Sequence, residues 1–203
     1  IFTLSTPNLV VVTGYPGDGK SAFIDQLIIN VARNSGWKTC YCSFEKPVQL
    51  HAVQLSQLLV GKPFFEGQNE RMNQEEKDYA QSWIKENILF QDYQDGGMPT
   101  IENILEKGAS AVMRYGIRIL VIDPFNFIQN DTKTGLVSGS MAWFSKADTG
   151  LTIYRSEDGV EIHNWKARWG WQGKMGSVNM IFNPINGRYA EAEEIEDNFD
   201  WDI

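Results

Sequence analysis

The feature that most constrains this chain is a glycine-rich segment close to its start. Residues 14–21 read GYPGDGKS, which fits the phosphate-binding loop pattern G-x-x-x-x-G-K-S/T. The segment follows an apolar run at residues 9–12, which we predict to be a buried strand. It precedes a stretch that we predict to be an amphipathic helix ending near Ser35, because apolar residues recur there at helical spacing (Ile24, Leu27, Ile28 and Val31). This order of strand, turn and helix is the context that the pattern requires, so a chance match is disfavoured.

The chemistry of these residues predicts a nucleoside triphosphate ligand. Glycines let successive backbone N–H groups point inward, where they and the helix N-terminus surround phosphate oxygens. Lys20 adds a positive charge for the β- and γ-phosphates, and the Ser21 hydroxyl is a hard oxygen ligand for Mg²⁺. We therefore predict ATP or a dNTP together with Mg²⁺, bound by Gly14, Tyr15, Pro16, Gly17, Asp18, Gly19, Lys20, Ser21 and Ala22.

Two acidic residues follow predicted strands and are candidates for the chemistry. An apolar run at residues 117–123 closes on Asp123, which is the Walker B pattern, and Glu45 follows a strand predicted at residues 39–44. Ligands bind at the carboxyl ends of the strands in an open parallel sheet. We predict that Asp123 holds Mg²⁺ and that Glu45 is the general base for the water that attacks the γ-phosphate. The alternatives are a buried strand that ends on Asp by chance and a solvated acid without a catalytic role.

Strands alternate with helices in the first part of the chain. Capping residues and periodicity predict one further strand and three helices, at residues 88–90, 48–60, 74–87 and 100–115. This order predicts an α/β fold with a mostly parallel, doubly wound sheet. Later strands, separated by turns, predict antiparallel hairpins appended to that sheet, at residues 151–155, 160–166, 178–182 and 188–189.

Length and charge fit one domain with an acidic end. The chain has 203 residues and a net charge of −8, but residues 191–203 contain seven acids and neither Lys nor Arg. Residues 1–190 are therefore nearly neutral, so the overall charge does not argue against a nucleic-acid partner. We predict an ATPase domain over residues 1–190 and an acidic, aromatic tail over residues 191–203.

Hydropathy and the cysteines bear on the compartment. The sequence contains neither an apolar stretch of roughly 18 residues nor a charged-then-apolar leader, so we expect no membrane contact and a cytoplasmic location in a bacterial or phage-infected cell. Cys40 and Cys42 share one face of a predicted strand and are badly placed to bridge each other, which favours small core residues in a reducing compartment. Four tryptophans favour hydrophobic anchoring over base stacking, at positions Trp143, Trp165, Trp169 and Trp171.

Four motifs together resemble the ATPase domain of the hexameric replicative DNA helicases of DnaB and Twinkle type. They are the phosphate-binding loop, Ser43-Phe44-Glu45, the Walker B segment VIDPFN at 121–126, and Lys166-Ala167-Arg168. The closest resemblance is to the helicase half of phage-like Toprim primase-helicases, and it extends from about Val10 to Tyr189. It implies a RecA-like P-loop NTPase fold and a ring that hydrolyses ATP or dNTP while it moves along single-stranded DNA.

The resemblance also implies roles for individual residues. It makes Glu45 the catalytic base, and it makes Lys166 and Arg168 a pair that reaches in trans into the site of the neighbouring subunit. The segment GSMAW at 139–143, followed by Lys146-Ala147-Asp148, resembles the loop and helix start that follow the central DNA-contacting loop. The catalytic candidates are therefore Lys20, Glu45, Lys166 and Arg168, and the candidate DNA-binding residues are Lys133, Gly139, Ser140 and Lys146.

The chain departs from this family between the Walker B strand and the Gly-Ser motif. Family members carry a helix, a strand ending in a phosphate-sensing His or Gln, and a pore loop there, whereas only residues 129–137 intervene here. Either the ATPase core lacks a strand, or the sequence joins segments that are apart in the whole protein; we favour the second. Neither His51 nor His163 matches the sensor position.

Other functions are weighed against the helicase. A RecA-like recombinase or nucleotide-gated DNA-binding ATPase would share the loop, Glu45 and Asp123, but the late Lys-x-Arg pair and the Gly-Ser motif favour the helicase. A small-molecule P-loop kinase needs an Arg-rich lid, which the sequence does not show. The tail is either a solvated end or edge strand, or a tethered ligand. Acidic tails of related phage helicases recruit the replicative polymerase, which makes that polymerase a candidate partner.

Overall fold

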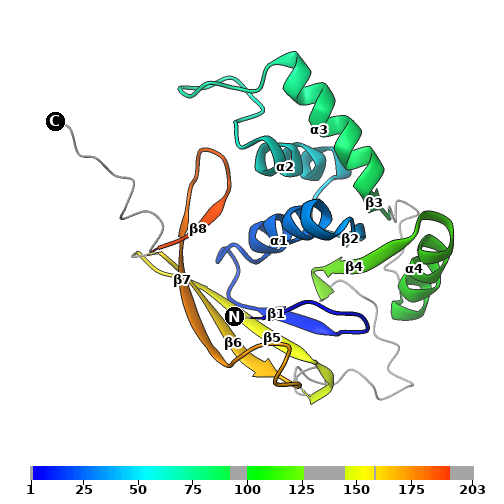
Figure 1. Cartoon of the computed structure of the whole chain (residues 1–203). Helices are drawn as coiled ribbons and strands as arrows, with labels where there is room; N and C mark the ends of the chain where they lie inside the picture. The colour runs from blue at the N-terminus through cyan, green and yellow to red at the C-terminus, as the bar shows by residue number, and fades with distance from the viewer. Residues whose placement is uncertain (1, 92–99, 126–144, 158, 193–203) are drawn as a thin grey trace. The chain divides into compact units, whose positions relative to one another are not determined.

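The computed structural model describes residues 2–91, 100–125, 145–157 and 159–192 (Figure 1). Its elements, in chain order, are β1 (Val10–Thr13), α1 (Lys20–Ser35), β2 (Lys38–Ser43), α2 (Val48–Val60), α3 (Gln74–Asn87), β3 (Ile88–Phe90), α4 (Ile101–Tyr115), β4 (Ile117–Asp123), β5 (Thr149–Arg155), β6 (Val160–Ala167), β7 (Gly176–Phe182) and β8 (Tyr189–Glu191). The predicted α/β class with a mostly parallel sheet and appended antiparallel strands is confirmed. None of the described helices is both long and apolar enough to cross a membrane.

The described strands pair into two sheets, where the sequence predicts one. The orders are β1-β5-β6-β7-β8 and β3-β2-β4, so the strand before the glycine-rich loop and the strand that ends at Asp123 belong to different sheets. The chain likewise divides into two compact units, and the division falls inside α1, between Phe23 and Ile24. The residues that join β4 to β5 include 126–144, which lie outside the described ranges.

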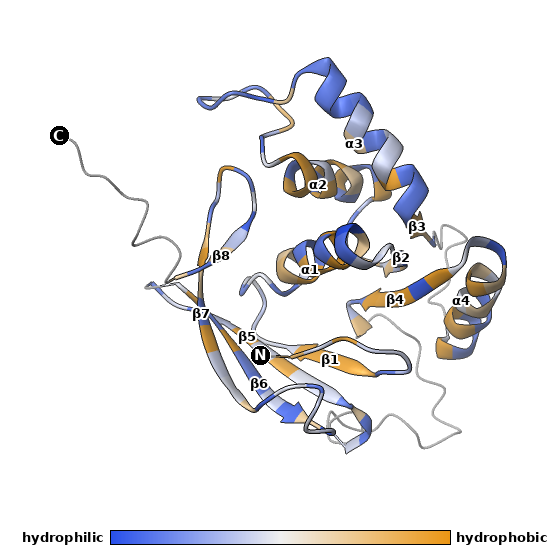
Figure 2. Cartoon of the chain, in the orientation of Figure 1, coloured by the Kyte–Doolittle hydropathy of each residue, from blue (hydrophilic) through white to orange (hydrophobic). Residues whose placement is uncertain are grey.

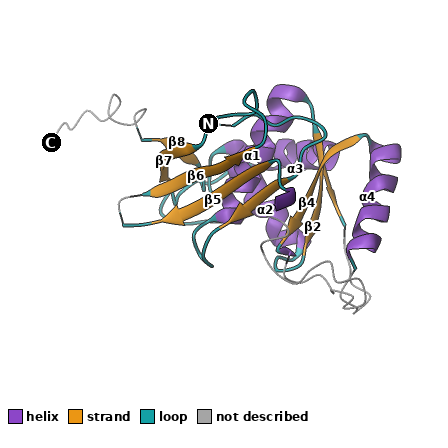
Figure 3. Cartoon of the chain, turned by 90° about the horizontal axis from the view of Figure 1, so that it is seen from below, coloured by secondary structure: helices purple, strands orange, loops and turns teal. Residues whose placement is uncertain are grey.

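One unit comprises residues 24–135 and 185–187 and contains the fully parallel sheet β3-β2-β4. Its main core joins α1, α2 and α3 to β2 through Ile28, Ile29, Tyr41, Leu55, Leu59, Ala80 and Ile84. Helix α2 is largely hydrophobic, whereas α3 is mostly hydrophilic (Figure 2). The buried residues of α3 are Ala80 and Ile84. Smaller clusters pack α4 against β2 and β4 (Figure 3). Cys40 and Cys42 are buried in these clusters as free thiols.

The other unit comprises residues 1–23, 136–184 and 188–203. Its β1 pairs with β5 in parallel, and β5 to β8 then form an antiparallel meander. The core consists of Ile153, Val160, Ile162 and Tyr189, with Ala22 and Phe23 from the first turn of α1 packed against them. The predicted hairpins are therefore present, and β8 includes Glu191, the first residue of the predicted tail.

Local signals account for four of the eight ends of the described helices. Asn73 caps α3 in a capping box with Glu76, and Thr100 caps α4 by accepting a hydrogen bond from the backbone N–H of Asn103. Gly61 and Gly116 end α2 and α4 in the left-handed conformation that favours glycine. By contrast, no side chain caps the start of α2 at Pro47.

Candidate active site

The glycine-rich loop connects β1 to α1 and is closed by its own lysine. The Lys20 ammonium donates to the carbonyl oxygens of Gly14 at 3.0 Å and Tyr15 at 2.7 Å. Gly14 has a φ of 144°, and a Cβ there would overlap the Ile153 carbonyl oxygen, so only glycine fits. The Asp18 carboxylate accepts the Tyr15 N–H at 3.0 Å, and the Asp18 N–H donates back to the Tyr15 carbonyl at 3.2 Å. These contacts give the loop a defined curvature around Lys20.

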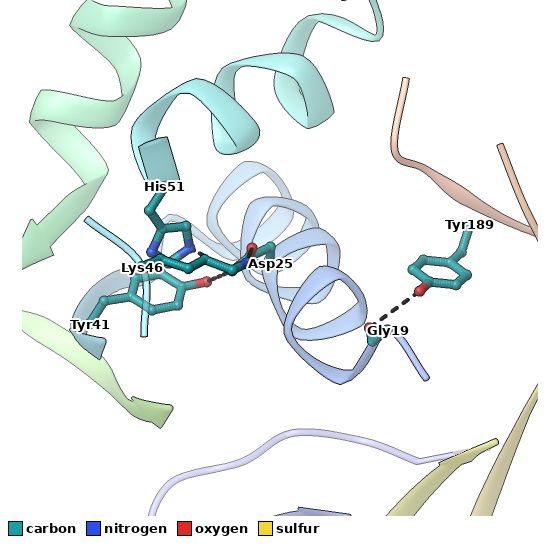
Figure 4. Close-up of polar contacts among 6 residues, drawn as sticks. All are labelled: Gly19, Asp25, Tyr41, Lys46, His51 and Tyr189. Carbon is teal, nitrogen blue, oxygen red and sulfur yellow. Dashed lines mark hydrogen bonds and ion pairs between the residues drawn. The ribbon is translucent and has the colours of Figure 1, made fainter. Parts of the chain in front are cut away.

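A tyrosine from β8 supports the loop from the side of α1. The Tyr189 hydroxyl donates to the Gly19 carbonyl oxygen at 3.2 Å (Figure 4), and the same oxygen accepts the Phe23 N–H at 2.9 Å. In a trans peptide the C=O and the next N–H point in opposite directions, so fixing the Gly19 carbonyl also orients the Lys20 N–H. Burial raises the pKa of the Tyr189 hydroxyl, which therefore stays a donor near neutral pH. Sequence reasoning missed this contact, which spans 170 residues.

The two strand-end acids lie together in the other unit. Ser43 is the register partner of Asp123 in the parallel pair β2–β4, and the Phe44 N–H donates to the Asp123 carbonyl at 3.0 Å. Glu45 follows directly and is exposed. The structure thus brings Glu45 and Asp123 to the carboxyl ends of neighbouring strands, the edge at which parallel sheets bind ligands.

The Lys-x-Arg pair at the end of β6 contacts the segment that precedes β5. The Lys166 ammonium donates to the Ser145 carbonyl at 3.0 Å, and the Arg168 guanidinium donates to Asp148 Oδ1 at 2.7 Å. The second oxygen of Asp148 accepts the Leu9 N–H at 2.9 Å, so this carboxylate joins the start of β1 to Arg168. Arg168 is 44% exposed. Asp148, in the segment that follows GSMAW, is therefore the shared partner of Leu9 and Arg168.

The candidate DNA-binding residues and the tryptophans lie outside the three groups described above. Lys133, Gly139 and Ser140 lie outside the described ranges, as does Trp143, whereas Lys146 is described and exposed. Trp165 packs on Gly150, where a Cβ would overlap its ring, which fits the anchoring interpretation for that residue. Trp169 and Trp171, at 53% and 65% exposed, are not buried anchors within the chain.

The two histidines have partners unrelated to the predicted sensor. His163 is exposed on β6 and lies 3.0 Å from a Glu161 carboxylate oxygen. His51, in α2, is buried, and its Nε2 lies 2.9 Å from Asp25 Oδ1. No sensor residue is therefore assigned within the described ranges.

Comparison with known proteins places this geometry in context. No protein-family model matches the chain. The Twinkle homolog of Arabidopsis thaliana, a chloroplastic and mitochondrial protein, is 28% identical over 248 residues, covering 95% of this chain and 35% of that protein. A solved ATPase domain superposes with a TM-score of 0.72 at 18% identity, covering 91% of this chain and 84% of that one. A DnaB-like replicative helicase, solved for its interactions with primase, gives 0.70 at 18% identity and covers 90% of this chain and 58% of that one.

The chain has the RecA-like fold of DnaB-like helicase ATPase domains. The fold that the motifs predict is thereby confirmed. This chain spans about a third of the length of the Twinkle homolog. The 248 aligned positions exceed its 203 residues, so at least 45 of them, the difference between the two, have no counterpart here. The motifs predict such a difference between Asp123 and Gly139.

Proposed function

We propose that this chain is the motor domain of a replicative DNA helicase, driven by ATP or dNTP hydrolysis. The observation that carries the proposal is the glycine-rich loop closed by Lys20, on a chain with the fold of helicase ATPase domains. The similarity to the Twinkle homolog, which extends over 95% of the chain, supports the helicase over other ATPases of the same fold.

The residues present fit a nucleotide with Mg²⁺. Gly14, Gly17 and Gly19 have positive φ angles, as a backbone that curls around phosphates requires, and Lys20 is the cation held against this loop. The hydroxyl of Ser21 and the carboxylate of Asp123 are hard oxygen donors of the kind that Mg²⁺ prefers. When bound, Mg²⁺ neutralises charge on the β- and γ-phosphates.

The remaining candidates supply the steps of hydrolysis. Glu45, exposed beside the Asp123 strand end, accepts a proton from the attacking water. Lys166 and Arg168 act in trans, on the phosphates bound by the neighbouring subunit, where an arginine stabilises the charge that develops during transfer. Each site is then shared by two subunits, an arrangement that either closes into a ring or continues as a filament, and we propose the closed form, a hexamer on single-stranded DNA.

The proposal extends to location and partners. Translocation uses phosphate contacts rather than base readout, so Lys146 and the candidates at Lys133, Gly139 and Ser140 are assigned to the DNA backbone. The cytoplasm of a bacterial or phage-infected cell is the proposed location. The replicative polymerase is the proposed partner of the acidic tail.

The decisive experiment measures ATPase rate with and without single-stranded DNA, together with ATP affinity. Wild-type protein is expected to be stimulated by DNA. Lys20→Ala loses binding and turnover together, whereas Glu45→Gln keeps binding and loses turnover, because only the first change removes a phosphate contact. An equal loss of binding in both variants contradicts the role of Glu45. Closed rings in negative-stain micrographs support the helicase, and filaments support a recombinase instead.

A further inference from the structure

A buried carboxylate connects three elements beside the proposed base. Asp25, in α1, is 2% exposed and is the only buried Asp or Glu among the described residues. Tyr41 from β2, His51 from α2 and Lys46 from the β2–α2 connection all turn toward it (Figure 4). None of the sequence motifs includes Asp25, so its cost in desolvation calls for a separate explanation.

The two oxygens of Asp25 have different partners. Oδ1 accepts the Tyr41 hydroxyl at 2.9 Å and lies 2.9 Å from His51 Nε2. A carboxylate can only accept, so the histidine donates from Nε2. Burial, and after it the charge and hydrogen bond of Asp25, raise the pKa of Tyr41, so its hydroxyl remains a donor. Oδ2 faces the Lys46 ammonium at 3.7 Å, and Lys46 is the member of the group in contact with solvent, at 23% exposed.

Lys46 is the residue directly after Glu45, and both neighbours of Glu45 are held. Before it, Phe44 donates its N–H to the Asp123 carbonyl and packs against Cys42 and Ile104. After it, Lys46 is drawn to Asp25. The helix that follows has no side-chain cap at Pro47, and the Lys46–Asp25 ion pair, at 3.7 Å, is a side-chain contact on this side of the turn. Glu45 itself stays exposed between the two anchors.

We propose that Asp25 and Lys46 form a positioning pair that holds the backbone of Glu45 in place. The pair is made through Oδ2 of Asp25, which faces the Lys46 ammonium. The inference rests on the proposed role of Glu45 as the base. Asp25 and Lys46 touch no reacting atom in this scheme. They connect the base to α1, the helix whose first residue is Lys20.

The division between the oxygens allows a selective test. Asp25→Asn keeps an acceptor oxygen for Tyr41 and His51 and replaces the oxygen that faces Lys46 with an uncharged donor. Lys46→Gln removes the same contact from the solvent side and serves if the Asn variant does not fold. Both changes are expected to lower kcat between roughly tenfold and a hundredfold, as for a misplaced catalytic group, with ATP affinity within about twofold of wild type. Lys46→Arg restores kcat, because it restores the ion pair.

The double variant separates positioning from a direct role of Lys46. If the lysine acts through Asp25, Asp25→Asn with Lys46→Gln is no slower than the slower single variant. Additive losses, or wild-type kcat in both single variants, overturn the proposal. Lys62→Gln is the matched control, since this lysine pairs with Glu70 and Glu76 instead, and it is expected to leave kcat unchanged.

A second readout does not depend on hydrolysis. Amide hydrogen exchange at residues 44–46, the last amides before Pro47, is measured without nucleotide. It is expected to accelerate in Asp25→Asn and Lys46→Gln and to stay unchanged in Lys62→Gln. Unchanged exchange in the first two variants overturns the positioning pair. If wild-type protein fails to hydrolyse ATP, or Glu45→Gln is fully active, the proposed function fails instead, and the exchange data alone decide whether Asp25 and Lys46 hold the segment.

Discussion

Arg168 is an exposed cation with a partner in its own chain. Its guanidinium pairs with Asp148 at 2.7 Å, and its backbone N–H donates to the Asp148 carbonyl at 2.8 Å. The carboxylate that holds it is itself fixed by the Leu9 N–H. An arginine supported in this way is restricted in orientation before it meets a phosphate, which lowers the entropy lost when it binds.

The first prediction concerns Arg168→Ala. Removing a trans-acting guanidinium should lower the ATPase rate by roughly a thousandfold or more and leave ATP binding to an isolated subunit unchanged. Steady-state turnover and equilibrium titration with a fluorescent nucleotide measure the two quantities. Arg71→Ala is the matched control, because Arg71 is 48% exposed and also pairs with a single carboxylate, that of Glu66.

Mixing variants tests the trans assignment. Arg168→Ala and Lys20→Ala proteins are each expected to be inactive, but a mixed ring would contain interfaces with an intact loop on one side and an intact arginine on the other. Partial recovery of ATPase activity at some mixing ratio is expected. Recovery at no ratio would place Arg168 in its own subunit's site, or indicate a strictly sequential ring, which stalls at the first defective interface.

At the scale of elements, Tyr189 connects β8 to the start of α1. Its hydroxyl bonds to Gly19, and its ring packs against two phenylalanine rings. The distance between ring centroids is 6.1 Å to Phe23 and 5.0 Å to Phe182. A Cβ on Gly19 would overlap the tyrosine hydroxyl, so the loop and the strand are fitted closely at this point. The strand thus supports the peptide that presents the Lys20 N–H.

The second prediction is that Tyr189→Phe weakens nucleotide binding without unfolding the chain. The change removes one hydrogen bond, with a net contribution of about 1 kcal/mol, and keeps the aromatic packing. ATP affinity should fall by up to about fivefold in calorimetric titration, and Tm should fall by no more than about 2–4 °C, the shift that the lost bond alone accounts for. Tyr154→Phe, in β5 and 48% exposed, is the control. A lower Tm with unchanged affinity would reduce Tyr189 to a core residue.

Elements whose ends depend on local residues could be predicted from the sequence. The bounds of α2, α3, β3 and β4 agree with the prediction because Asn73, Gly61 and Gly116 mark their ends locally. The starts of β5 and β7, at Thr149 and Gly176, lie two residues before the predicted positions 151 and 178. Those ends depend on pairing with β6, which is not visible in a local window.

The candidate site divides in the same way. Lys20, Glu45 and Asp123 could be predicted because each stands in a local pattern. Tyr189 and Asp25 could not, since their partners lie 170 and up to 26 residues away in the sequence. From the sequence, His51 is excluded from the sensor position and has no other predicted role, because nothing in its neighbourhood indicates the buried carboxylate that it contacts.

At the scale of the whole molecule, the described strands form two separate sheets. In the described ranges β1 pairs with β5 and β4 pairs with β2, and no described strand pairs with both β1 and β4. The alignment with the Twinkle homolog leaves at least 45 positions unmatched, as the difference between 248 and 203 shows. Assembly and DNA stimulation are therefore best measured on a protein that also contains counterparts of these unmatched positions.

The last prediction concerns the acidic end of the chain. β8 ends at Glu191 and the Ala192 N–H donates to the Asn179 carbonyl at 3.2 Å, so a truncation that preserves the sheet removes residues 193–203 only. This segment combines acidic residues with Phe199, Trp201 and Ile203 and contains no Lys or Arg. If it is a tethered ligand, its carboxylates steer it to a basic groove and its aromatic side chains dock there. In that case its negative charge should also compete with DNA for the protein's own pore.

Truncation should therefore leave DNA-stimulated ATPase activity unchanged or raised and abolish salt-sensitive binding to the cognate replicative polymerase, measured by interferometry at two salt concentrations. Two further variants separate the contributions. Phe199→Ala with Trp201→Ala keeps the charge and should raise the dissociation rate, whereas conversion of the tail acids to amides should lower the association rate and remove its salt dependence. Polymerase affinity that survives the truncation would contradict the docking role, because the only remaining contribution of this segment is then its charge.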